Sequence, residues 1–77
     1  MRTEDNLSTL LPPAEYQPTV PQVFQTLSSL DWFIRRNWTE LTELGAVVMP
    51  AGRKLIDRER MDQAILAIGK RRAQGVA

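Results

Sequence analysis

Arginine and lysine side chains are the groups of this 77-residue sequence best suited to chemistry, because the sequence contains no cysteine and no histidine. That inventory excludes disulfides, thiolate nucleophiles, imidazole acid-base catalysis and the usual zinc sites. No two carboxylates share a context expected to perturb their pKa values. We therefore expect no enzyme, no cofactor, no metal ion and no small-molecule substrate, but a surface that binds an anionic macromolecule.

The basic residues gather in the second part of the chain. From Asp31 onward nine Lys and Arg stand against six Asp and Glu, whereas acidic residues outnumber basic ones up to Leu30. An arginine can donate paired hydrogen bonds to a guanine edge or to a phosphate. A DNA-binding surface and an ordinary solvated surface both fit so small an excess. Three clusters hold most of the charge: Arg35-Arg36, Arg53-Lys54 and Lys70-Arg71-Arg72.

The first cluster needs a helix that turns it outward. Ser29 is well placed to cap a helix that begins at Leu30. At helical spacing, the apolar side of this helix consists of Leu30, Phe33 and Ile34. The opposite side is polar, basic and aromatic, with Asp31, Trp32, Arg35 and Arg36.

The end of this second helix is open on sequence alone. Leu41 and Leu44 continue its apolar stripe, so the helix can run to Gly45, which suits a C-cap. Alternatively it breaks at Asn37, which has the spacing of a new capping box with Glu40.

The segment before this helix is predicted in two parts. Residues 1–18 carry three prolines and no sustained periodicity, which predicts a flexible arm in which Leu10, Leu11 and Tyr16 have no assigned role. Thr19, with Gln22 three residues on, is predicted to cap a first helix of about two turns. Its apolar face consists of Val20, Val23, Phe24 and Leu27.

The segment after it predicts a hairpin and a third helix. Short apolar runs on both sides of Pro50 and Gly52 indicate a β-hairpin whose tip carries Arg53 and Lys54. Asp57 is expected to cap a helix that ends near Gly69, followed by a basic tail over residues 70–77. The buried face of this helix is predicted to be Met61, Ala64, Ile65 and Ile68.

Short helix, turn, second helix, basic hairpin and third helix is the order of a winged helix-turn-helix. We therefore predict a mainly α fold with a small β-hairpin over residues 19–69, whose second helix fills the major groove of DNA. The expected contacts from this recognition helix are Ser29, Asp31, Trp32, Arg35, Arg36 and Thr39. The expected wing contacts are Arg53 and Lys54, and the expected backbone contacts from the tail are Lys70, Arg71 and Arg72.

Some of these residues have alternative roles. Asp31 suits a helix-dipole role in the first turn better than a contact to cytosine. Trp32 lies opposite the apolar stripe, where it can pack on DNA, cover the hairpin, meet another protomer or fold back onto the core edge. Trp38 is expected in the core, and Leu66 lies off the apolar face of the third helix.

A family resemblance rests on three stretches: Ser29 to Arg36, Leu41 to Val48, and Gly52 to Asp57 with the helix that follows. Over about Thr19 to Ile68 the chain resembles the excisionases, or recombination directionality factors, of phages and integrative elements, and related MerR-like and AlpA-like winged-helix domains. The resemblance marks the fold better than the biological role. Two features depart from the family pattern: the low overall charge, and a recognition segment that can continue past Asn37.

What the resemblance implies is an architectural protein of a mobile genetic element. Several copies bind direct repeats in an attachment site, associate head to tail and bend the DNA, so that an integrase can run recombination in the excisive direction. On this basis Arg35 and Arg36 match the recognition helix, and Arg53 and Lys54 match the wing. The low charge makes self-association on DNA more necessary, since one protomer alone binds weakly.

Two other functions compete with this expectation. A small transcriptional regulator needs the same DNA contacts, and a protein-interaction module uses Trp32 and Leu66 instead of the basic surface. No apolar stretch approaches the roughly 20 residues that span a bilayer, and the N-terminal segment lacks the pattern of a signal peptide. We therefore expect a cytoplasmic, nucleoid-associated bacterial protein without a membrane partner.

Overall fold

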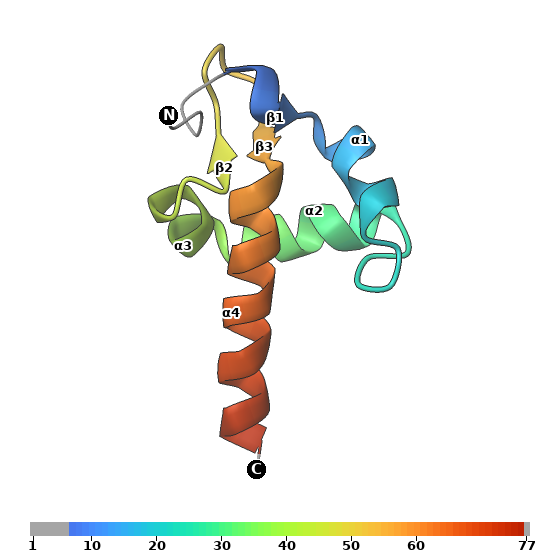
Figure 1. Ribbon diagram of the computed structural model, residues 1–77, viewed down its shortest axis with the longest axis vertical. Helices are drawn as coiled ribbons and strands as arrows, with labels where there is room; N and C mark the ends of the chain where they lie inside the picture. The colour runs from blue at the N-terminus through green and yellow to red at the C-terminus, as the bar shows by residue number, and fades with distance from the viewer. Residues whose placement is uncertain (1–6, 77) are drawn as a thin grey trace.

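The described part of the chain, residues 7–76 of a computed structural model, is mainly helical and carries a small three-stranded antiparallel sheet. Its helical elements are η1 (Leu7–Thr9), α1 (Pro13–Tyr16), η2 (Gln17–Thr19), α2 (Leu27–Arg36), α3 (Trp38–Glu43) and α4 (Arg58–Val76). Its strands are β1 (Leu10–Leu11), β2 (Val47–Val48) and β3 (Leu55–Asp57). The C-terminal half of α4 extends beyond the other elements (Figure 1).

The sheet contains the predicted hairpin and one further strand. β2 and β3 pair antiparallel, with Val47 opposite Ile56, around a turn in which the Gly52 N–H donates to the Met49 carbonyl. β1 pairs with the other edge of β3, where Leu11 also lies opposite Ile56. The order β1-β3-β2 therefore makes two residues of the N-terminal segment, Leu10 and Leu11, part of the sheet.

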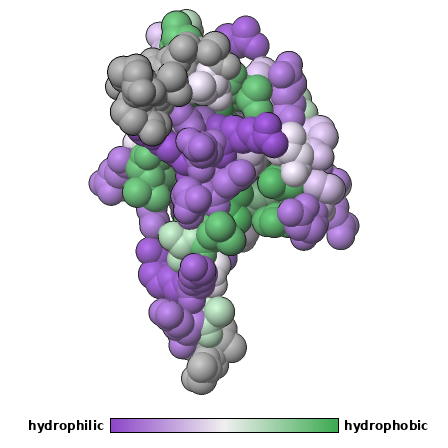
Figure 2. All heavy atoms as spheres, viewed as in Figure 1, coloured by the Kyte–Doolittle hydropathy of each residue, from purple (hydrophilic) through white to green (hydrophobic). Residues whose placement is uncertain are grey.

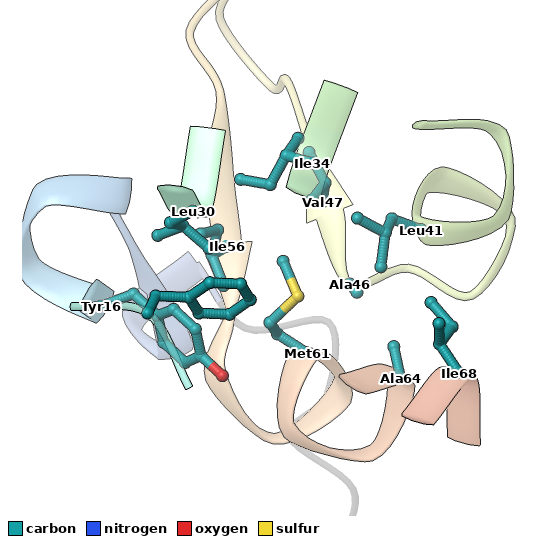
Figure 3. Packing of buried hydrophobic residues seen from close by; sticks show 11 residues of the cluster. Tyr16, Leu30, Ile34, Leu41, Ala46, Val47, Ile56, Met61, Ala64 and Ile68 are labelled. Atoms are coloured by element: carbon teal, nitrogen blue, oxygen red, sulfur yellow. The ribbon is translucent and has the colours of Figure 1, made fainter. Parts of the chain in front are cut away.

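Side chains from nearly every element build the hydrophobic core (Figure 3). The predicted stripe of α2 is confirmed, since Leu30 and Ile34 are fully buried and Phe33 packs against the core. Met61 of α4 points into the middle of the cluster (Figure 3). The buried apolar residues are Tyr16, Phe24, Leu30, Ile34, Leu41, Ala46, Val47, Ile56, Met61, Ala64 and Ile68.

The prediction of a flexible arm over residues 1–18 is wrong for the part that the structure describes. Leu10 and Leu11 form β1, and Tyr16 is fully buried with its hydroxyl donating to Asp62 of α4 at 2.5 Å. A buried aromatic ring and a paired strand together offset the entropy of ordering a proline-rich segment. Residues 1–6 lie outside the described residues, so the arm prediction is untested there.

The predicted first helix over residues 19–27 is also wrong. Pro21 disfavours the helical conformation in the residue before it, and Val20, with φ −133° and ψ 52°, is not helical. The Thr19 hydroxyl donates to the Tyr16 carbonyl at 2.7 Å and caps no helix. Phe24 of this loop is nevertheless buried, and its carbonyl accepts a hydrogen bond from the Gln17 side chain at 2.8 Å.

The second helix begins three residues earlier than predicted and breaks at Asn37. Thr26, rather than Ser29, is the N-cap, and Ser29 completes the capping box as its fourth residue. Asn37 separates α2 from α3, but its side chain donates to the Phe33 carbonyl and caps no helix. Of the two alternatives the break is therefore confirmed, without the capping box proposed for Asn37 and Glu40.

Gly45 ends α3 as predicted. It has φ +76°, a conformation that glycine adopts at little cost. The Ala46 N–H donates to the Leu41 carbonyl at 2.9 Å and the Gly45 N–H to the Thr42 carbonyl at 3.2 Å, which is a Schellman cap. Leu41 and Ala46 are both fully buried, so the cap also directs the chain from α3 into β2.

Helix α4 is capped as predicted but does not end near Gly69. The Asp57 carboxylate accepts a hydrogen bond from the Arg60 N–H at 3.1 Å. One glycine costs a helix only about 1 kcal/mol relative to alanine, and good helix formers follow Gly69. The helix therefore continues to Val76, and residues 70–76 belong to it instead of forming a separate tail. None of the helices between residues 7 and 76 combines the length and apolarity that crossing a bilayer requires.

Candidate nucleic-acid interface

The cap at the start of α2 and the buried residues on its inner side determine which residues lie on its outer face. The capping box at Thr26 and Ser29 satisfies free N–H groups of the first turn. Leu30 and Ile34 anchor the inner side in the core. Residues at the other angular positions must then face solvent, and Arg35 and Arg36 are both exposed.

Trp32 lies on this outer face beside the two arginines. Its side chain is 55% exposed, so the ring does not fold back onto the core. The guanidinium of Arg36 stacks over the indole, with its central carbon 5.0 Å from the ring centroid. Such a cation-π contact attracts the guanidinium to the face of the ring and so restricts the position of the Arg36 side chain, which stays exposed.

Two neighbouring hollows meet at Arg35 and Arg36. One is lined by these two arginines and Trp32. The other is lined by the same arginines together with Asn37, Trp38, Thr39 and Glu40. The break at Asn37 turns the chain from α2 into α3 at this point, so the predicted contact Thr39 lies beside the arginines.

Trp38 is not a core residue, contrary to the prediction. It is 38% exposed and helps to line the second hollow. The aromatic pair inside the molecule is instead Phe24 with Phe33, whose ring centroids lie 5.1 Å apart. Both tryptophans therefore flank the arginines on one surface.

The loop between β2 and β3 reaches the second turn of α2. The Lys54 ammonium lies 3.9 Å from the Asp31 carboxylate, and both side chains are partly exposed. Arg53, one residue earlier, is exposed. Because α2 begins at Leu27, Asp31 lies in its second turn, so the predicted helix-dipole role in the first turn is wrong; the Asp31 carboxylate instead faces the Lys54 ammonium of the hairpin.

The third basic cluster lies on α4, and one of its members is engaged within the protein. Arg71 and Glu40 form a bidentate pair, with Nη2 to Oε1 at 2.8 Å and Nη1 to Oε2 at 3.1 Å. The hydrogen bonds from Arg71 lower the pKa of the Glu40 carboxyl, and those to Glu40 raise the pKa of Arg71. Lys70 and Arg72 are exposed on either side of it.

The structure thus brings together some of the predicted contacts and separates others. Trp32, Arg35, Arg36 and Thr39 line the two adjoining hollows. Ser29 is exposed but engaged in the capping box, about two helical turns before Arg36. Sequence reasoning missed Glu40 as a member of this surface, although its capping-box spacing had drawn attention to it.

On the face shown in Figure 2, hydrophobic residues form several separate patches among hydrophilic ones. Exposed large apolar side chains occur in the loops and in several helices. Leu66 is among them, as predicted, at 56% exposure. Comparisons of the chain with protein-family models, with curated proteins and with solved structures found no significant match. Function must therefore be inferred from the residues of this chain.

Proposed function

We propose that the protein binds double-stranded DNA as a winged helix-turn-helix protein, with the outer face of α2 in the major groove. The observation that carries the proposal is the pair Arg35 and Arg36, exposed side by side at two hollows flanked by Trp32 and Trp38. No described carboxylate forms an ion pair with either arginine. Both guanidinium groups are therefore free to bind an anion or a base edge.

The chemistry of this face fits DNA better than a small anion. A helix of ten residues such as α2 fits the major groove, which is about 12 Å wide. A paired contact from an arginine to guanine discriminates against a wrong base by about 1–3 kcal/mol. Trp32 reduces the freedom that Arg36 loses on binding, because the stacked guanidinium is already partly ordered.

The hairpin supplies the wing. Arg53 stands exposed in the loop that follows β2, and this loop lies beside α2, where the Lys54 ammonium is 3.9 Å from the Asp31 carboxylate. Arg53 is then positioned to contact the phosphate backbone or the minor groove next to the site of α2. The helical content and the small antiparallel sheet are compatible with a winged helix.

One part of the common arrangement is different in this chain. The helix expected over residues 19–27 is absent, and α1 and η2 precede α2 across the loop that contains Phe24. Tyr16 and Phe24 pack in the same core as Leu30 of α2. The supporting part of the helix-turn-helix is thus α1 with this loop.

The biological role that we propose is that of an excisionase. This part rests on the resemblance of Ser29 to Asp57 to recombination directionality factors, which bind repeated sites, associate head to tail and bend DNA for an integrase. The wild-type protein should protect phased direct repeats next to its own gene from nuclease cleavage, and should raise excision of a mini-element by its integrase. Protection of a single palindrome, with excision unchanged, would indicate a transcriptional regulator instead.

DNA binding itself is tested by substitution of the two arginines. Arg35→Ala and Arg36→Ala should each weaken specific binding by about tenfold or more, as measured by fluorescence anisotropy on the protected sequence. Arg58→Ala removes the same charge from the start of α4 and serves as the control, with little expected change. Negligible binding by the wild-type protein even at low salt would overturn the proposal and favour a protein-interaction module.

A further inference from the structure

The geometry points to Arg71 as a second phosphate-binding group, which Glu40 occupies in the free protein and releases to a DNA phosphate. This inference rests on the proposed function and adds an exchange step to it. The bidentate pair joins α3 to the half of α4 that extends beyond the core. It therefore places a cation from a distant part of the chain next to the proposed DNA surface.

The position of Glu40 is the first observation. Glu40 lines the same hollow as Arg35 and Arg36, so a phosphate that approaches these arginines also comes near Glu40. The hydrogen bonds from Arg71 keep the pKa of Glu40 below its ordinary value, so the carboxylate is charged at neutral pH. A bare carboxylate there would repel DNA, and Arg71 neutralises it.

The form of the pair is the second observation. The two terminal nitrogens of Arg71 each donate to one carboxylate oxygen of Glu40, and a phosphate accepts hydrogen bonds in the same forked arrangement. A DNA phosphate can therefore take the place of the carboxylate without a new orientation of the guanidinium.

The exposure of the pair makes the exchange accessible. The Arg71 side chain is 62% exposed and the Glu40 side chain 33% exposed, so water and salt already weaken the attraction between them. DNA concentrates negative charge along its backbone, so phosphates compete effectively for such a cation. Arg71 lies three residues after Ile68, the last buried residue among those whose burial is described in α4, so no core packing fixes the Arg71 side chain.

The experiment compares four variants with the wild-type protein by anisotropy on the protected DNA over a range of salt concentrations. Glu40→Gln should tighten binding about three- to tenfold at low salt, because Arg71 no longer has to leave a carboxylate, with a salt slope close to that of the wild type, whose complex already contains the Arg71 contact. Arg71→Ala should weaken binding several-fold, because it removes the side chain that binds the phosphate and leaves the Glu40 carboxylate without its ion-pair partner. The double variant Glu40→Gln/Arg71→Ala should not show the tighter DNA binding expected of Glu40→Gln alone.

Glu43→Gln is the matched control, since it removes the same charge from the same helix and leaves the Arg71 pair intact. Thermal unfolding followed by circular dichroism checks that every variant is folded. Equal affinities of Glu40→Gln and Glu43→Gln would overturn the inference, as would tightening that persists in the double variant. If Arg35→Ala weakens binding but these results fail, the proposed function stands without the exchange; if Arg35→Ala has no effect, the proposed function fails first.

Discussion

The two ends of the described chain were predicted alike, as segments outside the domain, and they turned out differently. Residues 7–19 contribute a strand to the sheet and Tyr16 to the core, whereas residues 69–75 form an exposed helical extension. Both ends carry polar and helix-breaking residues. The difference is that the N-terminal segment contains Tyr16, whose ring is buried in the core and whose hydroxyl donates a hydrogen bond to Asp62.

The comparison shows that order and burial are separate properties. The N-terminal segment has very short elements of its own and is held by one buried side chain, Tyr16, and by the pairing of β1 with β3. The end of α4 is ordered because it continues a long helix, and its one ion pair to another described element is that between Arg71 and Glu40. Changes at the first end should therefore affect stability, and changes at the second should affect binding.

The largest effect is expected at Tyr16. Tyr16→Ala should lower the free energy of unfolding by about 3–5 kcal/mol, the usual loss for a buried aromatic, which is most of what a domain of this size possesses. Thermal and urea unfolding measure it. Trp32→Ala removes an aromatic ring from an exposed position and should change stability by only about 0.5 kcal/mol. Equal losses in the two variants would contradict the placement of Tyr16 in the core.

A smaller effect is expected when only the hydroxyl is removed. Tyr16→Phe should cost about 1 kcal/mol, because the hydrogen bond to Asp62 is lost while the ring stays. Circular dichroism melts at neutral pH measure this loss.

The same hydroxyl predicts a dependence of stability on alkaline pH. Burial, and then the hydrogen bond to Asp62, raise the pKa of Tyr16 above its ordinary value of 10.0. The unfolded state therefore loses this proton first, so the contribution is complete below pH 10.0 and decreases as the pH rises above it. Tyr16→Phe should show a weaker decrease than the wild type. Parallel stability curves for the two proteins would rule out the shift.

Binding, rather than stability, should respond at the C-terminal end. Lys70→Ala and Arg72→Ala should each weaken DNA binding about two- to threefold, equally on specific and unrelated sequences, with a salt slope reduced by less than about 0.9. Anisotropy titrations on both kinds of DNA measure this. An effect confined to the specific sequence would mean that this end of α4 contributes to base recognition.

The smallest effect is expected from truncation after Arg72. The residues removed include an exposed stretch of α4, Ala73 to Gly75, so Tm should change by less than about 4 °C. Removal of residues 1–11 instead takes away β1 and should lower Tm by more, because β3 loses a paired neighbour. Reversal of this order would show that the C-terminal helix supports the domain more than the added strand does.

Local signals in the sequence were sufficient where one residue acts on its neighbours. The stripe of Leu30 and Ile34, the cap at Asp57 and the glycine at the end of α3 were all predicted correctly. Each depends on a helical repeat or on hydrogen bonds between residues close in the chain. Helix ends were predicted less well, because Thr26 and Ser29 are both good caps and one glycine does not stop α4.

The residues of the candidate site likewise include some that local sequence signals predicted and some that they did not. The exposure of Arg35, Arg36 and Trp32 followed from the periodicity of α2. The ion pairs of Lys54 with Asp31 and of Arg71 with Glu40 join residues 23 and 31 positions apart, and no local pattern marks such partners. The exposure of Trp38 depended on the break at Asn37, because this break divides the segment into two helices, α2 and α3, with different directions.

By itself, then, the sequence determined which helix faces are apolar, where the hairpin turns and which arginines stand outward. Only the tertiary structure decided that Tyr16 belongs to the core, that Leu10 and Leu11 form a third strand, and that Arg71 is held by Glu40. The reason is physical. A periodic pattern specifies an element from its own residues, whereas burial and ion pairing depend on whichever surfaces the folded chain brings together.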